Sequence, residues 1–213
     1  MGDIYNILVA GVGGQGVISL AKILREYGMK ADLIKNVVGT ETRGVSQREG
    51  SVSATARFLI ESRIYSFDEQ YKSEDLISPL IPINDAHLVL GLEPLETVRN
   101  LKFISEQTLV IMNTHQLYPR SVIIDSTREK DYPSVAYIID LLDQFARRIV
   151  ALNVTELAQK KLGNSRYVNS IILGMATKEF QPIFIKKTIK KVLETFFGDP
   201  EKNIDAFDLG YSL

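Results

Sequence analysis

The fold is decided near the start of the chain by residues 4–16, which read IYNILVAGVGGQG. Residues 4–10 are a short apolar run of the kind that forms a buried strand, and glycines follow it at once. Beyond the glycines, the spacing of Val17, Leu20 and Leu24 places apolar side chains on one face of a helix. A strand, a glycine turn and a helix in this order predict the first unit of an α/β sheet.

The glycines match the pattern G-x-G-x-x-G at Gly11, Gly13 and Gly16. In nucleotide-binding folds the first glycine permits a tight turn, the second lets the backbone approach a phosphate, and the third lets the helix pack against the strand. The N-terminus of the following helix offers free N–H groups to an anion. We therefore expect a cofactor-binding loop that consists of Gly11, Gly13, Gly14, Gln15 and Gly16.

The second part of the dinucleotide-binding pattern is missing. It would place an acidic residue at the end of the second strand, about 20 residues further on. Residues 33–38 read LIKNVV at that point, Asp32 precedes them, and Glu41 lies in the next loop. Three interpretations stay open: the loop binds a nicotinamide or flavin dinucleotide, it binds a smaller anion or a segment of a partner, or it is only a turn.

Further apolar segments continue the alternation of strands and helices. Strands are expected at residues 31–38, 51–60, 88–92 and 108–112, with shorter candidates at 122–125 and 135–139. Helices are expected at residues 94–101, 141–147, 154–162, 167–178 and 183–197. This order predicts an α/β fold with a doubly wound, mainly parallel, Rossmann-like sheet and a helical C-terminal portion. We expect residues 1–213 to form one domain, with an α/β core at 1–140 and a mainly helical part at 141–213.

Ligands of such a sheet bind at the carboxyl ends of its strands, where this sequence carries polar residues and a long basic loop. The loop, residues 40–50, reads TETRGVSQREG. Its arginines have planar donor groups that suit carboxylates, phosphates and protein interfaces, although a solvated surface loop is the alternative. The residues expected to contact a substrate, coenzyme A or another subunit are Arg43, Gln47, Arg48, Ser51, Glu93 and Asn113.

Composition excludes several classes of function. The 213 residues include no cysteine, which removes disulfides, thiol nucleophiles, zinc–thiolate sites and iron–sulfur ligation from this chain. With only two histidines a histidine-rich metal site is not expected, and no residue stands out as a catalytic acid, base or nucleophile. The net charge of −1 gives no field that would attract nucleic acid or an anionic membrane. The N-terminus lacks a signal-peptide pattern, so we expect a cytoplasmic location.

Four motifs in order point to a known family. They are NILVAGVGGQGV at residues 6–17, RGVSQREGSV at 43–52 with ARF at 56–58, SPLIP at 78–82, and LGLEPLE at 90–96. In these motifs the chain resembles the gamma-type subunits of the 2-oxoacid:ferredoxin oxidoreductases, and in particular those of the indolepyruvate branch. It departs from their pattern at Arg43 and Glu49, where related subunits often have His and Gly.

The resemblance implies an accessory subunit that is inactive alone. The complete enzyme would decarboxylate indolepyruvate or other aryl pyruvates, transfer the acyl group to coenzyme A, and pass electrons to ferredoxin. Thiamine diphosphate and the 4Fe–4S clusters would belong to a large alpha subunit, which agrees with the lack of cysteine here. Two other classes stay open: a self-sufficient Rossmann oxidoreductase, and a regulatory or interaction protein without catalysis. A homodimer of the isolated chain also stays open.

Overall fold

The computed structural model describes residues 3–44, 50–60, 78–117 and 132–213 and contains one central mixed sheet. Its strands are β1 (Asp3–Val12), β2 (Ile34–Val38), β3 (Glu41–Arg43), β4 (Ser51–Ile60), β5 (Leu88–Gly91), β6 (Leu109–Asn113) and β7 (Arg148–Leu152). The strand order is β2-β4-β1-β5-β6-β7, with β3 paired to β4. The pairs β1–β5, β5–β6 and β6–β7 are parallel, whereas β4 is antiparallel to β1, β2 and β3.

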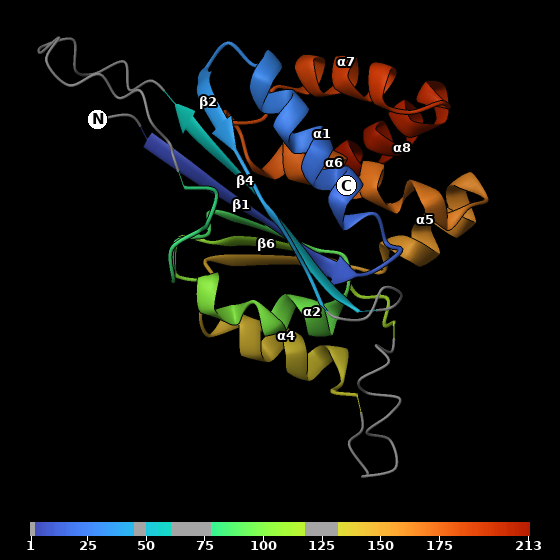
Figure 1. Cartoon of the computed structure of the whole chain (residues 1–213). Helices are drawn as coiled ribbons and strands as arrows, with labels where there is room; N and C mark the ends of the chain where they lie inside the picture. Colours follow the sequence, from blue (N-terminus) through green and yellow to red (C-terminus); the bar gives the residue numbers. More distant parts are fainter. Residues whose placement is uncertain (1–2, 45–49, 61–77, 118–131) are drawn as a thin grey trace, which may run out of the picture.

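Helices cover both faces of the sheet, as Figure 1 shows. One face carries α1 (Val17–Lys30), α5 (Val154–Leu162), α6 (Val168–Glu179), α7 (Lys186–Phe196) and α8 (Pro200–Ser212). The opposite face carries α2 (Pro94–Arg99), which leads into the short 3-10 helix at Leu101–Phe103, and α4 (Val135–Asp143). The predicted α/β fold class is therefore confirmed.

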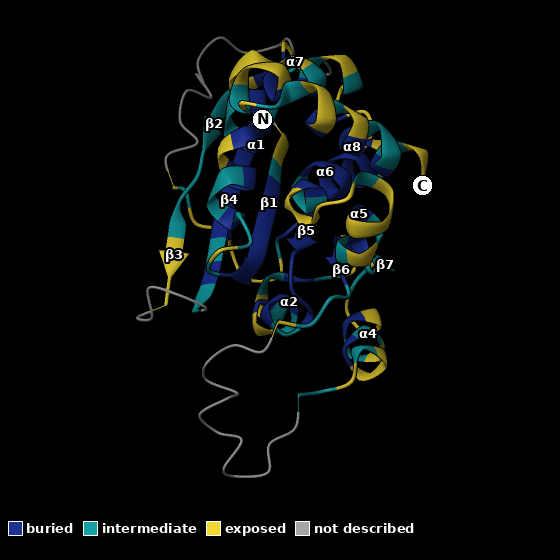
Figure 2. Cartoon of the chain, turned by 90° about the vertical axis from the view of Figure 1, so that its right-hand side faces the viewer, coloured by how far each residue is buried: buried dark blue, intermediate teal, exposed yellow. Residues whose placement is uncertain are grey.

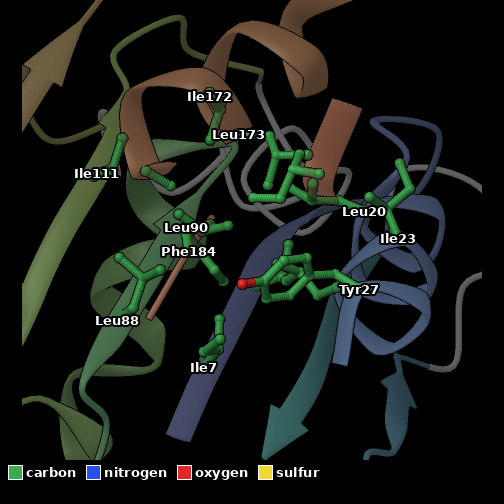
Figure 3. Close-up of a cluster of buried hydrophobic side chains, with 14 of the residues drawn as sticks. Ile7, Leu20, Ile23, Tyr27, Leu88, Leu90, Ile111, Ile172, Leu173 and Phe184 are labelled. Carbon is green, nitrogen blue, oxygen red and sulfur yellow. The ribbon is translucent and has the colours of Figure 1, made fainter. Parts of the chain in front are cut away.

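Each face has its own hydrophobic core. Successive side chains of β1 point to opposite faces and so belong to different cores. Ile7 and Val9 face α1 and α6, whereas Leu8 faces α2 and α4. Figure 3 shows the larger core, in which Ile7, Tyr27 and Phe184 come from the sheet, from α1 and from the C-terminal part of the chain. The central strands β1, β5 and β6 are mostly buried, whereas β3 and the outer sides of the helices are exposed (Figure 2).

Most of the predicted elements are present. The helix at Val154–Leu162 has the expected bounds, and the strands at Ser51–Ile60, Leu88–Gly91 and Leu109–Asn113 lie within one residue of the predicted ranges. The candidate strand at 122–125 falls outside the described residues.

Two predicted segments around residue 140 are wrong. Residues 135–139, expected as a strand, begin helix α4, because Ser134 accepts a hydrogen bond from the backbone N–H of Tyr137 and caps the helix. The predicted helix at 141–147 ends at Asp143 in the structure, and Arg148–Leu152 then forms strand β7 at the edge of the sheet.

Helix α8 is a further element that the sequence did not predict, since the last expected helix ends at residue 197. Pro200 stands in its first turn, where a proline needs no hydrogen-bond partner. The helix packs closely on α6 through two glycines: a Cβ at Gly174 would lie 2.1 Å from the carbonyl oxygen of Phe207, and one at Gly210 would lie 2.0 Å from that of Ile171.

Candidate functional site

The carboxyl ends of β1, β5, β6 and β7 meet at one edge of the sheet, and the predicted loops gather there. The start of β4 reaches the same edge, because its first residue, Ser51, pairs with Val12 at the end of β1. The backbone N–H of Gly13 donates to the carbonyl of Gly50 at 2.9 Å. The last residue of the basic loop therefore lies beside the glycine loop, while residues 45–49 fall outside the described residues. This bond also occupies an amide that a bound phosphate would use.

Both polar atoms of the Gln15 side chain form hydrogen bonds within the protein. Its Oε1 accepts from the backbone N–H of Val12 at 2.7 Å, and its Nε2 donates to the carbonyl of Leu92 at 2.9 Å. A Cβ at Gly11 would come within 2.8 Å of the same Oε1, so Gly11 leaves room for this amide. The side chain therefore shapes the loop.

Two other glycines of the loop have left-handed backbone conformations, which suit residues without a Cβ. Gly14 has a φ of 101°, and Gly16, which precedes α1, has a φ of 80°. The side chain of Asn169 reaches Gly16 from α6, and its Nδ2 donates to the carbonyls of Gln15 and Gly16 at 3.1 and 3.2 Å. Sequence reasoning missed Asn169, because nothing in its local pattern separates it from other polar residues at the start of a helix.

Asn113, at the end of β6, is buried and caps helix α5. Its Oδ1 accepts from the backbone N–H groups of Val154 and Thr155 at 3.0 and 3.3 Å, and also from that of His115. Its Nδ2 donates to Thr155 Oγ1 at 2.9 Å and to the carbonyl of Leu92 at 3.3 Å. Every polar atom of the side chain thus serves the fold.

Glu93, after β5, is a buried carboxylate held by three donors. Its Oε2 accepts from the backbone N–H of Glu96 and caps α2, while its Oε1 accepts from the Tyr132 hydroxyl and from the backbone N–H of Leu117. Burial raises the pKa of Glu93 above its usual value, although these hydrogen bonds oppose the shift. Burial and the neighbouring carboxylate also raise the pKa of the Tyr132 hydroxyl far above its usual value. Sequence reasoning found Glu93 but missed Tyr132.

Glu96, three residues further along α2, is a second buried carboxylate. Its Oε1 pairs with Arg99, and its Oε2 is buried without a hydrogen-bond partner in the described structure. Its negative charge contributes to the raised pKa of Glu93.

The remaining predicted contact residues are more open. Arg43 lies in β3 with 65% of its side chain exposed, and its guanidinium is 3.4 Å from Glu41. Ser51 is half-buried at the first position of β4. Gln47 and Arg48 fall outside the described residues. The structure therefore gathers Gln15, Glu93 and Asn113 through bonds around Leu92 and its neighbours. Arg43 lies apart from them, mostly exposed and paired with Glu41.

The described residues at this edge of the sheet include the exposed Arg43 and the exposed Leu117. Among residues 3–44, 50–60, 78–117 and 132–213, no three histidine or acidic side chains lie close enough together to hold a metal ion. In the same ranges no helix has both the length and the apolar character that a membrane span requires.

Comparison with known proteins matches these features to one family. The family model described as pyruvate ferredoxin/flavodoxin oxidoreductase matches residues 6–213. Two curated relatives, each named indolepyruvate oxidoreductase subunit IorB, come from Archaeoglobus fulgidus and Methanothermobacter thermautotrophicus. The first is 32% identical over 97% of this chain and 94% of its own length. The second is 36% identical over 81% of this chain and 77% of its own length.

Solved structures share the fold. Pyruvate oxidoreductase subunit PORC from Thermotoga maritima superposes with a TM-score of 0.64 at 18% identity, over 98% of this chain and 96% of that one. A 2-oxoglutarate:ferredoxin oxidoreductase from Magnetococcus marinus, solved with coenzyme A bound, gives a TM-score of 0.66 at 18% identity, and the match covers this whole chain but 31% of that longer one. The resemblance seen in the sequence is confirmed, and the chain belongs to the pyruvate ferredoxin/flavodoxin oxidoreductase family.

Proposed function

We propose that this chain is the accessory subunit of a cytoplasmic 2-oxoacid:ferredoxin oxidoreductase that acts on indolepyruvate or related aryl pyruvates. The observation that carries the proposal is the full-length similarity to the IorB subunit of Archaeoglobus fulgidus, which leaves little of either chain unmatched. The complete enzyme would release CO₂ from the 2-oxoacid, form the acyl thioester of coenzyme A, and pass two electrons to ferredoxin.

In this proposal the large subunit carries thiamine diphosphate and the iron–sulfur clusters. Cluster ligation requires thiolates, and this chain has no cysteine in its 213 residues, so its residues do not fit such a group. The small subunit then contributes binding and shape to the complex.

The carboxyl edge of the sheet is the surface that we assign to this task. The large subunit or coenzyme A would contact Arg43, Gln47, Arg48 and Ser51. Of the two that the structure describes, Arg43 is exposed and Ser51 is half-buried. Glu93 and Asn113 would support that surface from inside, because their polar atoms bond to neighbouring loops. An arginine that faces a phosphate or a carboxylate gains a charge-assisted hydrogen bond.

The test is reconstitution. The purified chain alone should not reduce a viologen dye with indolepyruvate and coenzyme A, whereas the chain together with its large subunit should. Turnover by the isolated chain would contradict an accessory role. Failure of the two chains to co-purify would favour an interaction protein of the same fold.

Calorimetry separates the proposal from a self-sufficient nucleotide-dependent oxidoreductase. We expect no heat of binding when NAD, NADP, FAD or FMN is titrated into the isolated chain, because the Gly13 amide is occupied and the second strand lacks its acidic residue. Stoichiometric binding of any of these dinucleotides or of FMN would favour that alternative.

A further inference from the structure

The segment from Ser78 to Asn84, SPLIPIN, carries two large apolar side chains into solvent. Leu80 is 63% exposed and Ile83 is 70% exposed, while Ile81 between them is buried in the smaller core. The segment contains no charged residue. Single exposed apolar residues are common on protein surfaces, but two in one uncharged segment form a patch that suits a protein partner.

The sheet holds this segment in place. Thr55 Oγ1 donates to the carbonyl of Pro79 at 2.8 Å, and Arg57 Nη1 donates to that of Ser78 at 2.6 Å. Further along, the backbone N–H of Asn84 donates to the carbonyl of Lys102 at 2.9 Å. Two prolines also restrict the backbone. A segment that is already ordered loses little conformational entropy when a partner binds it.

Thr55 and Arg57 lie on a sheet face where the described helices pack mainly on strands other than β4. Leu8 and Thr55 are opposite each other across β1 and β4 and therefore share a face, which is the face of the smaller core. On that face α2 packs mainly on β1, β5 and β6, and α4 packs on β7. Strand β4 is covered there by the Ser78–Asn84 segment.

Arg57 is a buried cation for which the described part of the chain provides no ion pair. It is 6% exposed, and its Nε donates to Asn6 Oδ1 at 2.7 Å. Asn6 in turn donates to Asp85 Oδ2 at 2.8 Å, so an amide lies between this acid and Arg57 in the chain of hydrogen bonds. Within the described residues, Nη2 has no hydrogen-bond acceptor and the guanidinium has no carboxylate at ion-pair distance. Burial accordingly lowers the pKa of Arg57 from its usual value.

Asp85 attracts Arg57 only from beyond ion-pair distance. A buried charge without a contacting counter-charge is costly, and an acidic side chain from outside would offset that cost. A second copy of this chain would not supply one readily. In a two-fold dimer the same patch meets itself, and the acid beside it, Asp85, already accepts hydrogen bonds from Asn6 and Gln107 of its own chain. The charge at this position therefore favours a different protein that presents a carboxylate beside an apolar surface.

We propose that the large subunit docks on the surface formed by Leu80 and Ile83, with apolar side chains against these two and an acidic side chain directed at Nη2 of the buried Arg57 beside them. The inference rests on the proposed function, because it takes the partner to be the large subunit. It adds a docking surface on the sheet face beside β4, distinct from the loops at the carboxyl edge.

The main test replaces the two exposed residues together, Leu80→Ser with Ile83→Ser, and measures the Kd of the large subunit for this chain. We expect binding to weaken roughly 30-fold, as loss of two interface anchors does. Both side chains lie largely in solvent, so the thermal midpoint of the isolated chain should stay unchanged. Met29→Ser is the matched control, because Met29 is 66% exposed on α1 and lies outside the proposed surface.

Arg57→Gln tests the charge. We expect the affinity of the complex to fall and to depend less on salt concentration than that of the wild type, because one ion pair is missing. A purely structural role for Arg57 would lower the thermal midpoint and leave the salt dependence unchanged.

The possible outcomes separate this inference from the proposed function. If the wild-type chain fails to bind the large subunit, the proposed function itself is wrong. If the wild type binds and the double serine variant binds equally well, the docking surface is wrong while the function stands. If the variant instead converts a dimer of the isolated chain to a monomer without affecting the complex, the surface joins two copies and the inference is also overturned.

Discussion

Gln15 and Leu92 connect the ends of two parallel strands, because the Gln15 side-chain amide donates to the Leu92 carbonyl at 2.9 Å. The same amide accepts from the backbone N–H of Val12 at 2.7 Å. One side chain thus fixes the turn after β1 against the turn after β5. In this chain the glycine-rich loop is shaped by its own glutamine, whereas the sequence pattern suggested that the glutamine would face a ligand.

Replacing Gln15 by alanine should destabilise the fold. Val12 is buried and its N–H would lose its partner, so we expect the free energy of unfolding to fall by about 1–3 kcal/mol. Urea unfolding measures this loss. Gln159→Ala is the control, since Gln159 is exposed on α5 and its hydrogen bond to Gly163 lies in solvent. Equal stability of the Gln15 variant and the wild type would show that the amide is free to bind something else.

Asn113→Ala should cost more than the loss of an ordinary helix cap. Its side chain is buried and bonds to three backbone N–H groups, one carbonyl and one hydroxyl, so we expect a loss of about 3 kcal/mol in unfolding free energy. Asn153→Ala, which removes the exposed cap of the same helix, should cost about 1 kcal/mol. If the two variants were equally stable, the network around Asn113 would not contribute as described.

Arg43→Ala should leave stability nearly unchanged and weaken function. Its ion pair with Glu41 is exposed, and such pairs contribute roughly 0–1 kcal/mol. We expect an unchanged thermal midpoint together with weaker assembly or a higher KM for coenzyme A in the reconstituted enzyme. Arg148→Ala removes an exposed arginine from the first position of β7, at the opposite end of the strands, and should change neither. If the Arg43 variant and the wild type had the same kinetics and assembly, Arg43 would be a solvated surface residue without a binding role.

The sequence predicted the fold where a pattern has one structural interpretation. The apolar run before Gly11 and the helical spacing after it have one structural interpretation each, so β1 and α1 were predicted. Residues 135–139 are different, because a short β-branched apolar run fits a strand or a buried helix equally well. The cap provided by Ser134 decides the outcome, and it appears only when the chain is folded.

For Glu93 and Asn113 the sequence predicted the end of the sheet at which they lie, but not the hydrogen bonds that they make. Glu93 and Asn113 were found because each follows an apolar strand, and the structure does bring them to one edge. Their hydrogen bonds to Leu117, Tyr132 and Val154 depend on segments far away in the sequence. Position along one chain can indicate which end of the sheet a residue occupies, whereas only tertiary contacts show whether its polar atoms are free.

The stability of this protein should depend on pH through Glu93. Burial raises its pKa in the folded state above the ordinary value of 4.5, so the folded protein binds more protons than the unfolded chain just above that value. This contribution is fully present below pH 4.5 and is lost as the pH rises through the higher folded pKa. Glu93→Gln cannot ionise, and its unfolding free energy relative to the wild type should therefore rise with pH across this window.

The control variant should show the opposite change of stability with pH. A hydrogen bond from Lys160 lowers the pKa of the exposed Glu156, so its contribution is present above pH 4.5 and is lost as the pH falls. Glu156→Gln should thus lose stability relative to the wild type as the pH rises through the same region. Parallel pH profiles for the Glu93 variant and the wild type would contradict a raised pKa at Glu93, whatever the constant cost of the substitution.

The contact between α6 and α8 should tolerate no added methyl group at Gly210. A Cβ there would lie 2.0 Å from the carbonyl oxygen of Ile171, which belongs to backbone and cannot rotate away, so the two helices would have to separate. We expect Gly210→Ala to lower the unfolding free energy by about 2–3 kcal/mol. Gly198→Ala is the matched control, since no atom lies within 4 Å of a Cβ at that position and its backbone is not left-handed. If Gly210→Ala unfolds at the same urea concentration as Gly198→Ala, the close packing of α8 on α6 is wrong. If it unfolds earlier, the helix that sequence patterns missed is an integral part of the fold.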